Sequence, residues 1–250
     1  MKRFCAFLLA LLFAAVPALA DPLPLLEDRT ESVSRLYDEE DPSAGQFVFS
    51  VRYPRADPDA PGGDQVNDFY ETRLRELQDF YIDHDFDYYQ EMSEDCVIDI
   101  SYEITCNNDA YFSVLVRKTV TAEEETVETW SGDTFDRLNG PIGLTASLPV
   151  LMGLLHAGDS DQWLDERQTQ KVSDAVVSLI MEEIRANPSG IAYREDLTED
   201  LLALALNAEE DFYLDETGNP VFFIFPGYIA DKEEGFLTFP VAFRDIEDEI

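Results

Sequence analysis

The chain has 250 residues, with 17 Lys and Arg against 53 Asp and Glu, so its formal net charge at pH 7 is −36. A charge this negative argues against DNA, RNA and anionic membrane surfaces as partners, and it permits cationic ones. Hydrophobic residues make up 45% of the chain, which is too apolar for a wholly disordered acidic protein. The length fits one large domain or two small ones.

The first 20 residues have the pattern of a targeting signal. Lys2 and Arg3 precede an apolar run over residues 4–16, and residues 18–20, Ala-Leu-Ala, form an A-x-A cleavage site. The run of about 13 residues is shorter than the about 20 that a spanning helix needs. We therefore expect residues 1–20 to be a signal peptide. The mature chain would be periplasmic or extracellular, with no membrane span.

The next stretch, residues 21–45, is an acidic, proline-rich N-terminal segment with a possible strand at Glu31–Tyr37. Residues 46–53 alternate between apolar and polar, which predicts a half-buried strand with Phe47, Phe49 and Val51 on one face. From Asp64 to Tyr88 the apolar residues recur every three or four positions. This period predicts one amphipathic helix of about seven turns, with Gly63 or Asp64 as its N-cap.

Residues 97–105 and 111–120 read as two strands joined at a turn over Asn107–Asp109, and Thr126–Trp130 reads as a further strand. A straight strand at 97–105 would hold the Cys96 and Cys106 sulfurs about 30 Å apart. A disulfide needs Cα atoms within about 7 Å. Export permits disulfides, but this spacing favours two thiols that do not bridge to each other.

The C-terminal half repeats the mixture of helix and strand. Residues 161–186 predict a second long helix, and residues 198–206 a short one. Residues 212–214, 221–225 and 236–243 predict strands, the last at an edge or bulged because Pro240 cannot donate a hydrogen bond.

This order of elements predicts an α+β fold. We expect antiparallel sheet or sheets, with one long helix in the N-terminal half and a second long helix packed on one side. The mature chain would then divide into a first α+β subdomain at residues 46–130 and a second at residues 131–250.

Motifs for chemistry are missing from the sequence. It has no H-E-x-x-H, C-x-x-C, Gly-rich phosphate loop or G-x-S-x-G, and neither His84 nor His156 points to a catalytic role. We assign no catalytic residue, metal ion or cofactor. A weak calcium site at Asp57, Asp59 and Asp64 stays open, although acidic clusters are more often solvated. Paired carboxyl groups for glycoside hydrolysis also stay open, because a sequence does not show a cleft.

Residues near the C-terminus carry the pattern of a known family. They are Phe212-Tyr213-Leu214, Gly218, the stretch 221–230 (VFFIFPGYIA), Gly235 and Phe239-Pro240-Val241. Upstream matches to the partner domain are Tyr53-Pro54, Asn67, Tyr102–Thr105 and Ser113. Together these residues resemble the paired extracytoplasmic domains of unknown function found in the lysozyme-binding anti-sigma factor RsiV. The same pair occurs beside polysaccharide deacetylase domains, as in PdaC.

Two segments depart from the family pattern. Residues 121–126 replace a G-G-A-H-type segment, and Pro226-Gly227-Tyr228-Ile229 replaces P-Y-E. No sigma-binding region or deacetylase domain is present in this sequence, so neither signalling nor deacetylation follows from the resemblance.

The resemblance implies a secreted or periplasmic, non-catalytic binding module of the RsiV-like family. Its partner would be lysozyme or another cationic envelope-active protein, and the negative charge favours the same kind of partner. Within the loop of residues 225–235, Pro226 and Tyr228 are the candidate ligand-binding residues, because an exposed Tyr anchors interfaces well. Tyr228 packed over the sheet edge, and a charge that serves solubility alone, are the plain alternatives. A hydrolase acting on cell-wall polysaccharide, or a glycan-binding accessory protein, is the alternative function.

Overall fold

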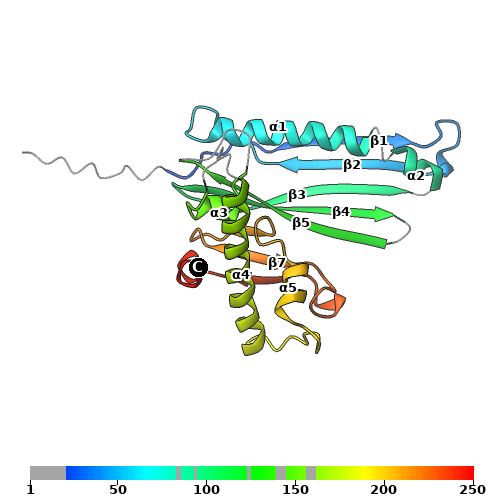
Figure 1. Ribbon diagram of the computed structural model, residues 1–250. Helices are drawn as coiled ribbons and strands as arrows, with labels where there is room; N and C mark the ends of the chain where they lie inside the picture. The colour runs from blue at the N-terminus through cyan, green and yellow to red at the C-terminus, as the bar shows by residue number, and fades with distance from the viewer. Residues whose placement is uncertain (1–20, 83–85, 93–94, 123–124, 139–144, 156–161) are drawn as a thin grey trace, which may run out of the picture.

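A computed structural model describes residues 21–82, 86–92, 95–122, 125–138, 145–155 and 162–250. These residues form a mixed α+β structure with one five-stranded and one three-stranded sheet, which agrees with the predicted fold class (Figure 1). The expected signal peptide at residues 1–20, as well as His84 and His156, lies outside the described residues. Within the described part of the chain, no helix combines the length and the apolar character needed to cross a membrane.

The first sheet has the strand order β1-β2-β3-β4-β5. Its strands are β1 (Arg29–Leu36), β2 (Gln46–Tyr53), β3 (Cys96–Asn107), β4 (Tyr111–Ala122) and β5 (Glu125–Asp136). The alternation predicted for β2 is confirmed, because Phe47, Phe49 and Val51 are buried. The sheet therefore includes one strand from the stretch 21–45, and its last strand continues past residue 130.

One strand pair departs from the antiparallel arrangement expected from the sequence. β2 and β3 run parallel, whereas the other three neighbouring pairs are antiparallel. The physical reason is the long crossover between these two strands, which contains two helices and returns the chain in the same direction.

The seven-turn helix predicted over Asp64–Tyr88 is helical where it is described. α1 covers Gly63–Phe80, residues 81–82 form a π-helical turn, and α2 covers Phe86–Met92, while residues 83–85 lie outside the described residues. The Phe86 ring on α2 lies 5.5 Å from Tyr37 and 5.9 Å from Phe47 between centroids, so α2 packs on the first core. The predicted N-cap is wrong: Gly62 caps α1 at a φ of 85°, a conformation that favours glycine.

The predicted strand Thr126–Trp130 is too short. β5 pairs with β4 from Glu125 to Asp136, so the strand continues through Gly132. This glycine is required by packing, because a Cβ atom there would lie 1.6 Å from the backbone oxygen of Phe212. A glycine that reads as a loop signal in the sequence therefore permits close contact between β5 and the C-terminal sheet.

The second sheet has the order β6-β7-β8, with β6 at Phe212–Leu214, β7 at Pro220–Ile224 and β8 at Leu237–Pro240. Its helices are α3 (Leu148–Leu151), α4 (Gln162–Ala186), α5 (Glu199–Ala205) and α6 (Phe243–Glu249), and short 3-10 helices lie at Pro42–Ala44 and Lys232–Glu234. The long helix predicted at 161–186 and the edge position of Pro240 are confirmed. The strand predicted over 236–243 is wrong beyond residue 240, where the chain turns into α6.

Two hydrophobic cores hold the molecule together. One lies between α1 and the first sheet, and the other between the second sheet and helices α3–α6. The long helices α1 and α4 thus pack on different sheets (Figure 1). Where the two sheets meet, the buried Ser113 hydroxyl on β4 accepts a hydrogen bond from the Leu214 N–H on β6 at 2.9 Å. The same hydroxyl shares a hydrogen bond with the Thr134 hydroxyl on β5 at 2.8 Å.

Cys96 and Cys106, the two cysteines among the described residues, are buried in β3 and do not bridge to each other. The strand holds them near its two ends, with a shift in the β3–β4 pairing between Ile104 and Cys106. Burial, and to a smaller extent the negative charge of Asp215, raises the pKa of the Cys106 thiol to about 11. This thiol therefore stays protonated and unreactive near neutral pH.

Candidate functional site

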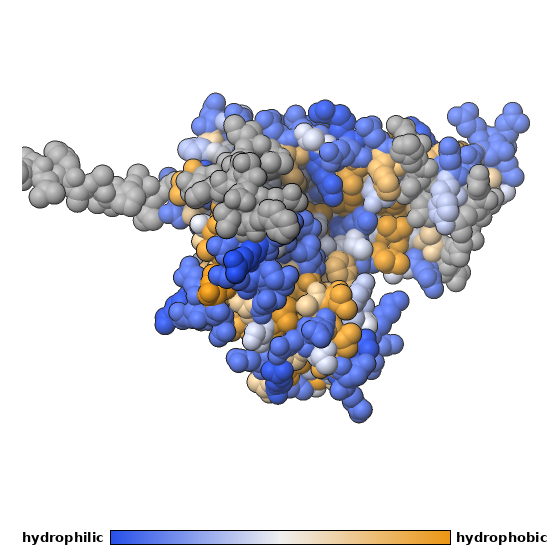
Figure 2. Space-filling model, in the orientation of Figure 1, coloured by the Kyte–Doolittle hydropathy of each residue, from blue (hydrophilic) through white to orange (hydrophobic). Residues whose placement is uncertain are grey.

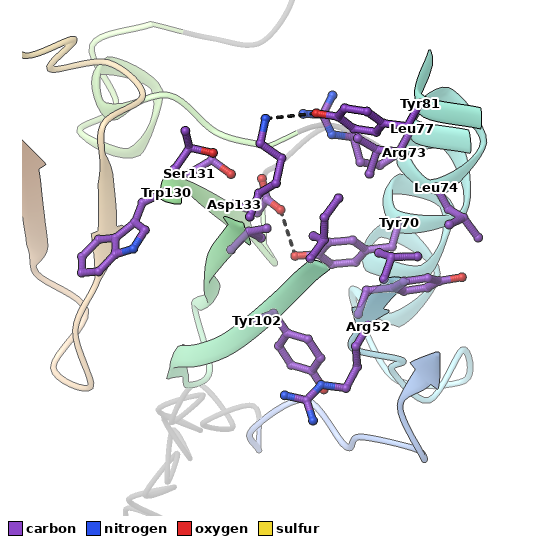
Figure 3. A pocket seen from close by; sticks show the side chains of 16 residues that line it. Arg52, Tyr70, Arg73, Leu74, Leu77, Tyr81, Tyr102, Trp130, Ser131 and Asp133 are labelled. Carbon is purple, nitrogen blue, oxygen red and sulfur yellow. Dashed lines mark hydrogen bonds between the residues drawn. The ribbon is translucent and has the colours of Figure 1, made fainter. Parts of the chain in front are cut away.

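A cavity of about 210 Å³ lies between α1 and the face of the five-stranded sheet (Figure 3). Strand pairing sets Ile100 beside Val51 on one side and Lys118 on the other, so these three residues line the same face. Hydrophilic residues cover the outer side of α1, whereas hydrophobic residues gather beneath it (Figure 2). The aliphatic part of the cavity wall consists of Val51, Leu74, Leu77, Ile100 and Val116.

Among the described residues that line the cavity, Asp133 is the single carboxylic acid. The Tyr70 hydroxyl donates a hydrogen bond to Asp133 Oδ2 at 3.1 Å (Figure 3). Burial raises the pKa of Asp133 to about 6, although the Tyr70 hydrogen bond and the Arg73 charge oppose the rise. Burial, and to a smaller extent the negative charge of Asp133, raises the pKa of the Tyr70 hydroxyl well above its ordinary value. Tyr70 therefore remains a hydrogen-bond donor at neutral pH.

Basic side chains reach the cavity from the opposite walls. Lys118, on β4, donates through Nζ to the Tyr81 hydroxyl oxygen at 3.0 Å, and Nζ lies 5.7 Å from the centroid of that ring. Arg73, on α1, is exposed to solvent where the cavity opens. Arg52 lies beside the cavity with its guanidinium 5.6 Å from the Tyr102 ring centroid. A lysine ammonium has three protons to donate, so Lys118 retains donors for a ligand beyond its bond to Tyr81.

Trp130 marks the place where the cavity wall meets the C-terminal sheet. Its indole points away from the cavity (Figure 3). The indole stacks on Phe236, with the centroids 4.0 Å apart and the planes 2° apart. Phe225 lies 5.3 Å from Phe236, and Tyr228 lies 6.4 Å from Phe225. We call Trp130, Phe236, Phe225 and Tyr228 the aromatic column.

The residues proposed from the sequence, Pro226 and Tyr228, lie at the outer end of this column. Tyr228 is 55% exposed, while Pro226 is half-buried. Gly227 between them has a φ of 84°, which lets the chain turn there. Arg194 donates through Nη1 to the Tyr228 backbone oxygen at 3.3 Å and holds the turn in place. The structure brings these two residues together with each other but does not bring them to the cavity.

The structure also describes Asp57, Asp59 and Asp64, where the sequence left a calcium site open. The Asp57 carboxylate accepts the Asp59 backbone N–H at 3.0 Å, so it serves a local turn. Within the described ranges, no three His, Cys, Asp or Glu side chains are grouped so that they could hold a metal ion.

Sequence reasoning did not find the cavity. Its polar groups come from two segments far apart in the chain. Tyr70 lies on α1 and Tyr81 directly follows it, whereas Lys118 lies on β4 and Asp133 on β5. One signal was present, because Lys118 falls in phase with Val114 and Val116 and so occupies a position that faces the core. A charge on the inward row of a strand indicates either a partner or a ligand.

Comparisons with known proteins give a fold but no activity. A DUF3298 family protein from Bacteroides fragilis NCTC 9343 shares 13% identity, over 92% of this chain and 94% of that chain, with a TM-score of 0.52. A DUF3298 family protein from Pseudomonas aeruginosa PAO1 shares 7% identity, over 91% of this chain and 94% of that chain, with a TM-score of 0.45. No protein-family model and no curated protein matches the chain. The chain thus shares its fold with a solved protein of a family of unknown function.

Proposed function

We propose that this protein is an exported, non-catalytic binding module of the RsiV-like extracytoplasmic family. We further propose that it captures a basic, envelope-active protein such as lysozyme. The observation that carries the proposal is Tyr228, which is 55% exposed at the outer end of the aromatic column. The signal-like residues 1–20 support export, and the fold shared with a DUF3298 protein supports the family assignment.

The loop between β7 and β8 combines the two features that a basic partner would use. Tyr228 offers a large aromatic surface that rests on Phe225 and is therefore partly ordered before binding. Asp231, Glu233 and Glu234 lie exposed on the same loop, against a single basic residue, Lys232. These acids would attract a cationic protein and speed its association, while Tyr228 would slow its dissociation.

Binding of residues 21–250 to lysozyme tests this function. The measurement compares low salt with about 0.5 M salt, because salt screens exposed charges beyond a few ångströms. Tyr228→Ala removes the proposed anchor. Tyr88→Ala is the matched control, since Tyr88 is 59% exposed on α2, outside the loop.

We expect binding that persists in high salt and weakens at least about tenfold in Tyr228→Ala, or about 1.4 kcal/mol, with little change in Tyr88→Ala. Binding seen only at low salt, and equal in both variants, would reduce the interaction to charge attraction and overturn the proposal. Binding to cell-wall glycan in place of lysozyme would favour the glycan-binding alternative, and release of sugars from that glycan would favour the hydrolase.

A further inference from the structure

The residues that line the cavity beneath α1 include more basic than acidic side chains, the reverse of the balance in the whole chain. The chain carries 17 basic residues against 53 acidic ones. The residues that line the cavity include Arg52, Arg73 and Lys118 against Asp133 alone. Burial raises the pKa of Asp133 to about 6, so this carboxyl group is mostly ionised at pH 7 and becomes protonated as the pH falls below 6. Arg52 lies 4.0 Å from Asp28 and Arg73 lies 3.7 Å from Glu76, and these side chains are exposed, so Lys118 is the cation that a ligand inside the cavity would meet.

We propose that this cavity binds a small organic carboxylate whose apolar body is about the size of one six-membered ring. The carboxylate group would meet the Lys118 ammonium, and the ring would lie between the aliphatic side chains of α1 and the sheet. This site is separate from the loop that carries Tyr228, so the inference does not depend on the proposed function.

The size of the cavity sets the size of the ligand. An apolar protein cavity of about 150 Å³ can hold a benzene molecule. The volume here is about 210 Å³, which leaves room for one ring and a carboxylate group. Leu74 and Leu77 from the helix face Ile100 and Val116 from the sheet across this space, so a flat apolar body finds contacts on both sides.

The position of Lys118 determines where in the cavity the charged end of the ligand would lie. Its Nζ is fixed by the hydrogen bond to the Tyr81 hydroxyl at 3.0 Å, and the residue is only partly exposed. A preorganised ammonium in a partly buried site interacts more strongly with an anion than one in water does. Tyr70, on the helix wall of the cavity, donates its one hydroxyl proton to Asp133 on the sheet wall at 3.1 Å, so Lys118 is the donor available to the ligand's carboxylate.

The test uses 4-fluorobenzoate as the probe and 4-fluorobenzyl alcohol as its uncharged counterpart, followed by fluorine NMR. With about ten non-hydrogen atoms, the carboxylate should bind with a dissociation constant of about 1 mM or tighter. We expect the alcohol to bind at least about tenfold more weakly, because it forms no ion pair.

Three variants locate the site. Lys118→Met removes the ammonium but keeps an unbranched side chain, and Lys171→Met is the matched control because Lys171 is exposed on α4. Val116→Phe fills the cavity from β4 without changing any charge. Tyr228→Ala tests whether the probe binds at the aromatic column instead.

We expect Lys118→Met to lose about tenfold or more in carboxylate affinity while it binds the alcohol as the wild type does, which also shows that the cavity is intact. Val116→Phe should bind neither probe, and Lys171→Met and Tyr228→Ala should bind both normally. The proposal is overturned if the wild type shows no saturable binding of the carboxylate up to about 10 mM, the range that fragments of this size reach. Carboxylate binding that is unchanged in Lys118→Met, or lost in Tyr228→Ala, overturns it equally.

Discussion

At the scale of single residues, the Tyr70–Asp133 pair places an ionisable group beside the core between α1 and the first sheet. Asp133, on β5, is part-buried beside the cavity and accepts a hydrogen bond from the Tyr70 hydroxyl at 3.1 Å. Burial disfavours the ionised carboxylate more than the hydrogen bond and Arg73 favour it, which places its pKa at about 6. An acid whose pKa is raised on folding destabilises the folded state once it ionises.

This shift gives the protein a specific pH dependence. Below about pH 4 Asp133 is protonated in both the folded and unfolded states and contributes nothing, whereas above about pH 6 it is ionised in both. The rise from 3.8 to about 6 corresponds to about 3 kcal/mol. We expect the free energy of unfolding of the wild type, measured in urea, to fall by up to that amount relative to Asp133→Asn between about pH 4 and about pH 7.

Asp99→Asn controls for the loss of one negative charge, because Asp99 is exposed on β3. If the wild-type and Asp133→Asn curves run parallel across this pH range, burial does not raise the pKa of Asp133.

At the scale of elements, β5 connects the two halves of the molecule. One face of the strand presents Thr129, Ser131 and Asp133 to the cavity beneath α1. The other face carries Trp130, which stacks on Phe236, and Gly132, which approaches the backbone of Phe212. Neighbouring residues of a strand point to opposite faces. β5 therefore contributes to the cavity with one face and contacts the C-terminal sheet with the other.

The close approach at Gly132 makes a strong prediction. In Gly132→Ala the new Cβ would lie 1.6 Å from the Phe212 backbone oxygen, so β5 and β6 must separate. Overpacking of this kind destabilises a protein by about 1–3 kcal/mol, and backbone contacts leave little freedom to relax. We expect a loss of stability at or above the upper end of this range, measured by urea unfolding.

Val127→Ala is the matched control for this prediction, since Val127 is 57% exposed on the same strand. It should change the free energy of unfolding by no more than about 0.5 kcal/mol. A Gly132→Ala protein as stable as this control would show that the two sheets are not in close contact at β5.

At the scale of the whole molecule, two cores are enclosed in a strongly negative surface. Ion pairs such as Arg117–Glu103 and Arg185–Glu199 relieve this charge only locally, because the side chains involved are largely exposed and each pair contributes little. The remaining acids repel one another in the folded state more than in the expanded chain. The net charge of −36 thus favours solubility and cationic partners while it weakens the fold.

Salt should therefore stabilise this protein. At about pH 8, raising NaCl from about 20 mM to about 300 mM shortens the Debye length from about 20 Å to about 6 Å and screens the repulsion. We expect the melting temperature to rise by about 2–4 °C, which corresponds to about 1 kcal/mol for a protein of this size. The same experiment near pH 4.5 is the control, because many carboxyl groups are protonated there and the rise should shrink. An equal rise at both pH values would assign the effect to something other than charge repulsion.

Local patterns in the sequence predicted most of the elements. The alternation at Phe47, Phe49 and Val51 placed β2 with its buried face, and Pro240 placed β8 at an edge. Predictions failed where segments far apart in the chain decided the outcome: β2 and β3 run parallel, joined by the crossover that contains α1 and α2. The length of β5 was missed because the glycine at position 132 is required by close contact with the backbone of Phe212 in β6, which the residues around Gly132 in the sequence do not reveal.

The sites divide in the same way. Pro226 and Tyr228 were chosen from one continuous loop, where adjacent residues are close by covalent connection, and their role stays a prediction. The cavity groups Tyr70, Lys118 and Asp133 come from different elements, and no spacing along the chain relates them.

By itself, the sequence determined the strong negative charge, the mixed α+β class and most of the helices and strands, because composition and hydrophobic period are local properties. The tertiary structure alone decided the parallel β2–β3 pair, the two separate cores and the cavity with its basic lining. Each of these features depends on which helices and strands pack together in the folded chain. Packing between residues far apart in the sequence decides that arrangement.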